Sequence, residues 1–239
     1  MNKVTIYPKD DETTSDQIGR SAKPTTLVTR NTARLLALGA IAGPILFTLA
    51  WFILGFVSPG FTMWDIVVEP YSPISQPISG LGLGLTAPFM NVAFILGGLL
   101  MITGAVGIFQ GILEMGSIAR WSSTLLLALT GLGMVIDGIF TLESIMVHTA
   151  GFLLGTGTPV LSFLVIGLLL RSIPRWRQFG GWLLVGSPLT LVLLGLFFAT
   201  NDPVAAGAGL GVNGLVQRIL VTEVLVWVVI MGWRTFRRS

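Results

Sequence analysis

The stretch LLALGAIAGPILFTLAWFILGFV, residues 35–57, decides the fold class of this 239-residue chain. It contains no ionisable side chain and is longer than the roughly 20 apolar residues with which an α-helix crosses a bilayer. Five more apolar windows follow it in the sequence. The six predicted spans are residues 35–57, 89–110, 121–141, 149–170, 179–200 and 214–233.

The composition supports the same interpretation. Hydrophobic residues make up 53% of the chain and charged residues only 10%, too few to cover a soluble protein of this size. Lipid must therefore surround it, and we expect an all-α polytopic membrane protein with six transmembrane helices in one bundle. The chain has no cysteine, which excludes disulfides and thiolate metal sites. Its basic residues form no continuous stripe, so we expect anionic lipid headgroups and no nucleic acid as their partners.

Lys and Arg residues predict the orientation of the bundle. Thirteen of the fourteen fall in segments that share one side of the membrane if the N-terminus is cytoplasmic. The fourteenth, Arg218, lies within the sixth window, so the opposite loops carry none. Cytoplasmic loops are enriched in these residues, and the bias therefore predicts a multi-pass protein of the cell membrane with both termini cytoplasmic.

The ends of the chain differ from its centre. Residues 1–30 are polar, mix acidic and basic side chains and show no apolar periodicity, which predicts a disordered cytoplasmic tail. The first apolar window begins too late for a secretory signal, so we interpret it as a retained span. Residues 35–233 then form the transmembrane domain, and residues 234–239 form a short basic cytoplasmic tail.

Five ionisable residues lie inside or at the edge of the predicted spans: Asp137, Glu143, His148, Arg218 and Glu223. Ionisable groups in a membrane are costly and usually face a cavity or a partner. With the predicted orientation, all five fall toward the outer surface. Because Arg218 stays protonated and Asp137 lies at a similar depth, we expect the two to form an ion pair, which is either structural or part of a cavity.

His148 is the single histidine, and it follows Asp137 and Glu143 closely in the chain. A histidine at a helix start is often merely a capped interfacial residue. An imidazole beside a carboxylate is also a common acid and base arrangement, so His148 and Asp137 are the candidate catalytic pair. We expect no metal and no cofactor, because a zinc site needs three or four close ligands.

The first outer loop, residues 58–88, contains four prolines before Gly80 that prevent a continuous helix. It is either a passive connector or a re-entrant segment that lines a cavity. Tyr71, Ser75 and Ser79 lie there in apolar surroundings and favour the second interpretation. Ser79 as a nucleophile is a further hypothesis, although its flanks match no nucleophile-elbow motif.

Four segments together resemble the bacterial and archaeal membrane-protein family known as domain of unknown function 998. They are YSPISQPISGLG at residues 71–82, the stretch from Asn91 to Gly98, DGIF at residues 137–140 followed by His148, and GLVQR at residues 214–218 with Trp227 beyond. The resemblance implies a six-span bundle of uncertain biochemistry. It also adds Asn91 and Gln217 to the candidate pocket residues.

Two residues depart from the family pattern. The family usually has an acidic residue where this chain has Gly80, and Glu where this chain has Gln217. If those carboxylates serve chemistry, this member has altered it. Three functions therefore stay open: binding or moving a small molecule or lipid through an outer-facing polar pocket, an intramembrane enzyme acting on a lipid or isoprenoid substrate, and a non-catalytic membrane assembly subunit.

Overall fold

The computed structural model describes residues 30–238, so the predicted tail before Arg30 lies outside the described residues. Six helical segments in this part of the chain are long and apolar enough to cross a membrane, and each overlaps one predicted window. The predicted all-α, six-span bundle is confirmed. The elements are α1 (Arg30–Ala37), α2 (Gly39–Val57), β1 (Phe61–Met63), β2 (Ile66–Val68), η1 (Ile78–Gly82), η2 (Gly84–Thr86), α3 (Ala87–Gln110), α4 (Ser117–Ile139), η3 (Leu142–Ser144), α5 (Ile145–Phe152), η4 (Leu153–Gly157), α6 (Thr158–Arg171), α7 (Arg177–Ala199), α8 (Pro203–Gly207) and α9 (Asn213–Arg238).

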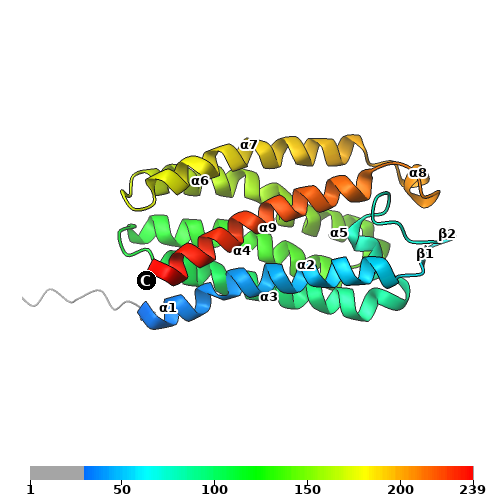
Figure 1. Cartoon of the computed structure of the whole chain (residues 1–239), viewed down its shortest axis with the longest axis horizontal. Helices are drawn as coiled ribbons and strands as arrows, with labels where there is room; N and C mark the ends of the chain where they lie inside the picture. Colours follow the sequence, from blue (N-terminus) through cyan, green and yellow to red (C-terminus); the bar gives the residue numbers. More distant parts are fainter. Residues whose placement is uncertain (1–29, 239) are drawn as a thin grey trace, which may run out of the picture.

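The long helices run side by side along the longest axis of the molecule (Figure 1). Helix α3 packs against α1, α2 and α4, while α9 packs against α2 and α7. The start of α1 and the end of α9 lie at one end, which we call the basic end because Arg34, Arg171 and Arg237 belong to it. The strands and α8 lie at the opposite end, which we call the loop end.

Small residues bring the first helices into close contact. A Cβ atom added to Gly104 of α3 would meet the backbone of Ala40, and one added to Gly43 of α2 would lie 2.6 Å from the carbonyl oxygen of Gly97. Only glycine permits this approach of two helix backbones, which in a membrane associate through such packing rather than through the hydrophobic effect. The contact fixes α2 beside α3 and so sets one wall of the bundle.

The loop after α2 has more structure than the sequence indicates. It begins with a two-stranded antiparallel hairpin in which Phe61 pairs with Val68 and Met63 with Ile66. After the hairpin, the chain turns back toward the bundle, and the 3-10 helix η1 is buried along its whole length. Buried loop backbone needs its own hydrogen-bond partners, which come here from α9 and are described below.

The fourth span starts earlier than its predicted window. The predicted windows 121–141 and 149–170 leave residues 142–148 between two spans, but these residues form the 3-10 turn η3 and the beginning of α5, so His148 lies inside a helix. Further along, η4 is a π-helical turn. Pro159 follows it and cannot donate a backbone hydrogen bond to the turn before, which accounts for the local change of helix type.

The last span also differs from its predicted window. Helix α9 continues to Arg238, so residues 234–238 extend the helix rather than leave it as a separate tail.

Candidate functional site

Ser79 and His148 meet at the loop end of the bundle. Ser79 lies on η1 and His148 on α5, yet the Ser79 Oγ atom is 2.8 Å from His148 Nε2. Both side chains are buried, with 6% and 4% of their surface exposed. Pro77 sets this geometry locally, because it has extended backbone angles and turns the chain directly into η1. Two residues 69 positions apart in sequence thus share one hydrogen bond.

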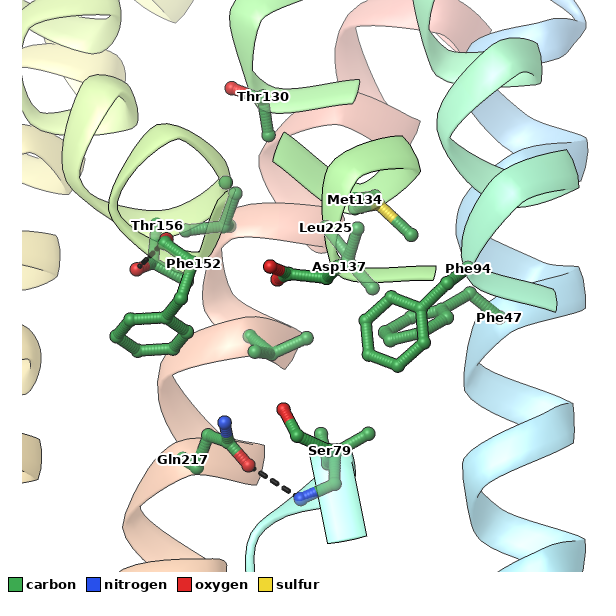
Figure 2. Close-up of a pocket in the computed structure, with 14 residues that line it drawn as sticks. Phe47, Ser79, Phe94, Thr130, Met134, Asp137, Phe152, Thr156, Gln217 and Leu225 are labelled. Atoms are coloured by element: carbon green, nitrogen blue, oxygen red, sulfur yellow. Dashed lines mark hydrogen bonds between the residues drawn. The ribbon is translucent and has the colours of Figure 1, made fainter. Parts of the chain in front are cut away.

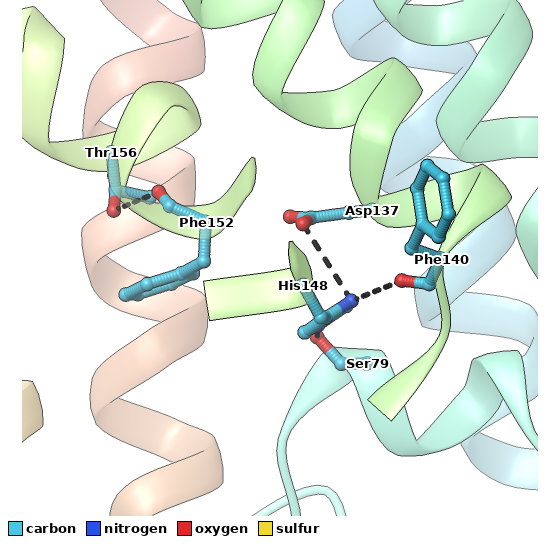
Figure 3. Close-up of polar contacts among 6 residues, drawn as sticks. All are labelled: Ser79, Asp137, Phe140, His148, Phe152 and Thr156. Carbon is cyan, nitrogen blue, oxygen red and sulfur yellow. Dashed lines mark hydrogen bonds and ion pairs between the residues drawn. The ribbon is translucent and has the colours of Figure 1, made fainter. Parts of the chain in front are cut away.

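The other ring nitrogen of His148 fixes the direction of that bond. His148 Nδ1 lies 2.7 Å from the carbonyl oxygen of Phe140, as Figure 3 shows. A carbonyl oxygen only accepts hydrogen bonds, so Nδ1 carries the hydrogen. In the neutral imidazole Nε2 is then an acceptor, and the Ser79 hydroxyl donates to it.

The Phe140 carbonyl is available because α4 ends at the residue before it. Phe140 has φ −108° and ψ 100°, which leaves the helical conformation and turns its carbonyl oxygen away from the helix ladder. The last carbonyls of a helix have no partner within it, and His148 supplies one here. The end of α4 therefore holds the imidazole in one tautomer.

Asp137 is the third member of this cluster. Its Oδ1 atom lies 3.6 Å from His148 Nδ1, and both side chains are almost fully buried. This oxygen has no hydrogen-bond partner among the described residues. Gly151 of α5 makes room for it, because a Cβ atom at that position would collide with the carboxyl group. The Asp137 carboxyl therefore lies close to the imidazole, while the Nδ1 hydrogen of His148 is donated to the Phe140 carbonyl oxygen.

A cavity of about 40 Å³ adjoins this cluster. That is room for a few water molecules or part of a small apolar group. Figure 2 shows Ser79, Asp137 and Gln217 around it. Thr130 and Thr156 complete its polar side. The rest of the wall is Gly155 and eight apolar side chains: Phe47, Ile78, Phe94, Met134, Phe152, Val221, Val224 and Leu225.

Gln217 connects this cavity to the loop. Its side-chain oxygen accepts a hydrogen bond of 2.6 Å from the backbone N–H of Ile78, the residue before Ser79. Its amide nitrogen lies on the cavity side of the side chain in Figure 2. Across residues 30–238, no hydrogen bond from this nitrogen to another residue is found. Gln217 thus positions Ser79 and offers a donor to whatever enters the cavity.

Arg218 does not form the predicted ion pair with Asp137. Its Nη1 atom donates to the carbonyl oxygens of Pro73 at 2.7 Å, Gln76 at 3.0 Å and Gly214 at 3.0 Å. The loop carries backbone carbonyls into an apolar region, and a guanidinium group with five donors satisfies several at once.

Tyr71 completes this contact between the loop and α9. Arg218 Nη2 donates to the Tyr71 hydroxyl oxygen at 2.6 Å, and the hydroxyl donates in turn to the Pro77 carbonyl at 3.0 Å. Burial raises the pKa of Tyr71, while the nearby Arg218 acts in the opposite direction. The hydroxyl therefore keeps the hydrogen that it donates. Gln76 donates a further hydrogen bond from its amide to the Ala206 carbonyl at 2.8 Å. We call Tyr71, Gln76, Gln217 and Arg218 the loop clamp, because their hydrogen bonds hold the loop in place.

The remaining predicted site residues lie apart from the cluster. Ser75 is fully buried and its hydroxyl has no partner within residues 30–238, while Asn91 donates to the Gly82 carbonyl at 3.3 Å. Glu143 is exposed and accepts a hydrogen bond from the Thr141 hydroxyl at 3.5 Å. Glu223 faces α7, where it accepts a hydrogen bond from Thr190, and it accepts a second one from Trp227 on its own helix α9. The structure thus groups Ser79, Asp137, His148 and Gln217, and separates them from the other four.

Two parts of the site were not predicted from the sequence. The Phe140 carbonyl is a backbone group and leaves no signal in residue type. The residues of the apolar wall, such as Phe47 and Phe94, cannot be distinguished by sequence from membrane-facing residues of the same uniformly apolar helices. Within residues 30–238, no group of three or more His, Asp or Glu side chains is arranged to hold a metal ion.

Comparison with known proteins identifies a family but no characterised relative. No curated protein and no solved structure matches the chain. The sequence profile described as "Protein of unknown function (DUF998)" matches residues 41–234, which include every member of the cluster and the loop clamp. The predicted resemblance is confirmed, and the chain belongs to this family of membrane proteins.

Proposed function

We propose that this protein is an intramembrane hydrolase that cleaves the ester bond of a lipid, with Ser79 as the nucleophile. The observation that carries the proposal is the hydrogen bond from the Ser79 hydroxyl to Nε2 of a histidine whose Nδ1 is oriented from the other side. A nucleophile bonded to a base that a third group orients is the recurring arrangement of serine hydrolases. The proposal places the protein in the cell membrane with both termini cytoplasmic and the site toward the outer surface.

The proposed first step forms an acyl enzyme. Ser79 Oγ attacks the carbonyl carbon of the ester while His148 Nε2 takes the hydroxyl proton. The bond between the carbonyl carbon and the alcohol oxygen then breaks, and the departing alcohol takes the proton from His148. In the second step water attacks the acyl group, gives a proton to His148 and releases the fatty acid, and Ser79 recovers its proton. Water is the only co-reactant, so the reaction needs no metal and no cofactor.

Two further side chains support these steps. His148 becomes positively charged when it holds the proton, and the Asp137 carboxyl 3.6 Å from Nδ1 stabilises that charge in a medium of low dielectric constant. The Gln217 amide nitrogen is the donor that can stabilise the negative oxygen of the tetrahedral intermediate. An ionised Glu in place of Gln217 could only accept hydrogen bonds and could not donate to this oxygen. The Gln that departs from the family pattern therefore favours catalysis.

A lipid fits the site better than a water-soluble substrate. Most of the cavity wall is made of aromatic and branched aliphatic side chains. The cavity also lies among helices that are apolar enough to cross a membrane, so lipid acyl chains are the most abundant molecules around it. We infer that the scissile ester sits beside Ser79 and that the acyl chain takes the apolar side.

The test is a comparison of two serine variants of the full chain in lipid nanodiscs. We expect Ser79→Ala to lower the hydrolysis of 4-nitrophenyl butyrate by about a thousandfold or more, in line with the loss of a serine nucleophile. Ser75→Ala is the matched control, because Ser75 lies on the same loop, is also buried and makes no hydrogen bond through its hydroxyl to any residue that the structure describes. Its activity should equal that of the unchanged protein.

Equal activity of Ser79→Ala and the unchanged protein would contradict the hydrolase proposal. Binding of a lipid in the same pocket, without turnover, would then be the better account.

A further inference from the structure

A second hollow lies on the outside of the bundle between α2 and α9. It has a volume of about 280 Å³ and apolar walls apart from two threonines. We call it the α2–α9 groove. Ile45, Leu49 and Val226 on its rim are about half exposed, at 49%, 54% and 47%. Its lining residues are Pro44, Ile45, Thr48, Leu49, Thr222, Leu225, Val226, Val229 and Ile230.

The groove and the Ser79 cavity share one wall. Leu225 lines both hollows, and 5% of its surface is exposed. On α2, Phe47 lines the cavity while its neighbour Thr48 lines the groove. The Leu225 side chain therefore borders both spaces, and rotamer changes of such a side chain are fast compared with enzymatic turnover.

The depth of the groove suits an acyl chain. Its α9 residues, 222–230, lie near the middle of that helix, whereas Gln217 beside Ser79 lies near its start at the loop end. The eight positions from Gln217 to Leu225 correspond to about 12 Å along the helix axis. A bilayer lipid has the same arrangement: its ester lies near the membrane surface, and its acyl chain extends from there toward the middle of the bilayer.

We propose that the α2–α9 groove takes the acyl chain of a bilayer lipid, which passes Leu225 to bring its ester to Ser79. This inference rests on the proposed function and names the substrate class: a lipid ester taken sideways from the bilayer rather than from water. The groove lies between two helices that cross the membrane and is open on its lipid-facing side, so acyl chains are its natural occupants.

The first experiment changes the width of the passage. The full chain in phosphatidylcholine nanodiscs is assayed with 4-nitrophenyl palmitate and 4-nitrophenyl butyrate, which share the scissile bond and differ in chain length. Leu225→Trp should lower the ratio of kcat/KM for palmitate to that for butyrate by about tenfold or more, since a blocked apolar pocket discriminates by at least this factor for small changes in size. Leu225→Ala should raise the ratio.

The matched control for the first experiment is Leu191→Trp. Leu191 lies on α7, is 55% exposed to the surroundings of the bundle and lines neither hollow. This variant should leave the ratio unchanged. An unchanged ratio in a well-folded Leu225→Trp protein would overturn the inference.

The second experiment detects the chain itself. Phosphatidylcholine with a photoreactive diazirine in its acyl chain is added to nanodiscs that contain the Ser79→Ala protein, and labelled positions are mapped by mass spectrometry. We expect labels on Ile45 and Leu49 of the groove and on Phe94 and Met134 of the cavity. Leu225→Trp should remove the cavity labels and retain those of the groove.

The two experiments separate the inference from the function on which it rests. Labels in the groove and cavity without any Ser79-dependent hydrolysis would refute the hydrolase and keep the acyl-chain route. Ser79-dependent hydrolysis of butyrate without cavity labels would keep the hydrolase and refute the route.

Discussion

Removal of the Arg218 guanidinium should destabilise the loop that carries Ser79. In Arg218→Ala the carbonyl oxygen of Pro73 loses its donor and that of Gln76 keeps only the Tyr71 hydroxyl at 3.5 Å. Each buried polar group left without a good partner costs about 1–3 kcal/mol. Part of this cost is offset, because a positive charge is no longer buried. We therefore expect the free energy of unfolding to fall by about 3 kcal/mol. For a domain of this size that corresponds to a decrease of about 6–12 °C in Tm.

The assay is thermal unfolding of the purified full chain in detergent, followed by intrinsic tryptophan fluorescence. Arg237→Ala is the matched control on the same helix, because Arg237 is exposed and lies over the ring of Trp233 at the basic end. It should change Tm by less than about 2 °C. Arg218→Lys should recover less than half of the loss, since an ammonium lacks the planar fork that reaches Tyr71 and the carbonyls together. Equal Tm values for Arg218→Ala and Arg237→Ala would refute this account of the loop.

Three further predictions concern packing, chemistry and orientation. Gly104→Val should cost about 1–3 kcal/mol through overpacking against Ala40 and lower the yield of monodisperse protein, whereas Gly181→Val, where a Cβ meets no atom within 4 Å, should not. Gln217→Glu should lower kcat for 4-nitrophenyl butyrate by about a hundredfold, the effect of losing one oxyanion donor, and a change below twofold would remove Gln217 from catalysis. Because the chain has no cysteine, single cysteines report orientation cleanly: in intact cells an impermeant maleimide should label Glu143→Cys and not Ser172→Cys, and the reverse pattern would invert the orientation.

The sequence contains enough to predict the bundle, because the physical requirement is one-dimensional. A span needs only enough consecutive apolar residues, and the six windows meet that condition independently of one another. The boundaries are less predictable where a helix starts among polar residues. His148 illustrates this, since it lies inside α5 rather than at the start of a predicted span.

The partners of the polar residues were harder to predict than the residues themselves. The cost of burying ionisable groups in lipid identified Asp137, His148 and Arg218 as significant. A similar depth in the membrane, however, does not determine which of these side chains face one another. The prediction that Arg218 pairs with Asp137 was wrong because carbonyls of the buried loop after α2 compete with a carboxylate for the guanidinium group. Sequence reasoning treats a loop backbone as solvated, and this one is buried.

The central claim is that Ser79 is a nucleophile activated by His148. The most direct measurement is mass spectrometry of the full chain after reaction with a fluorophosphonate probe, which labels activated serines covalently. Our account predicts one adduct, on Ser79, that persists in Ser75→Ala and disappears in His148→Ala. A Ser79 that stays unlabelled in the folded protein, or that is labelled equally without His148, would contradict it.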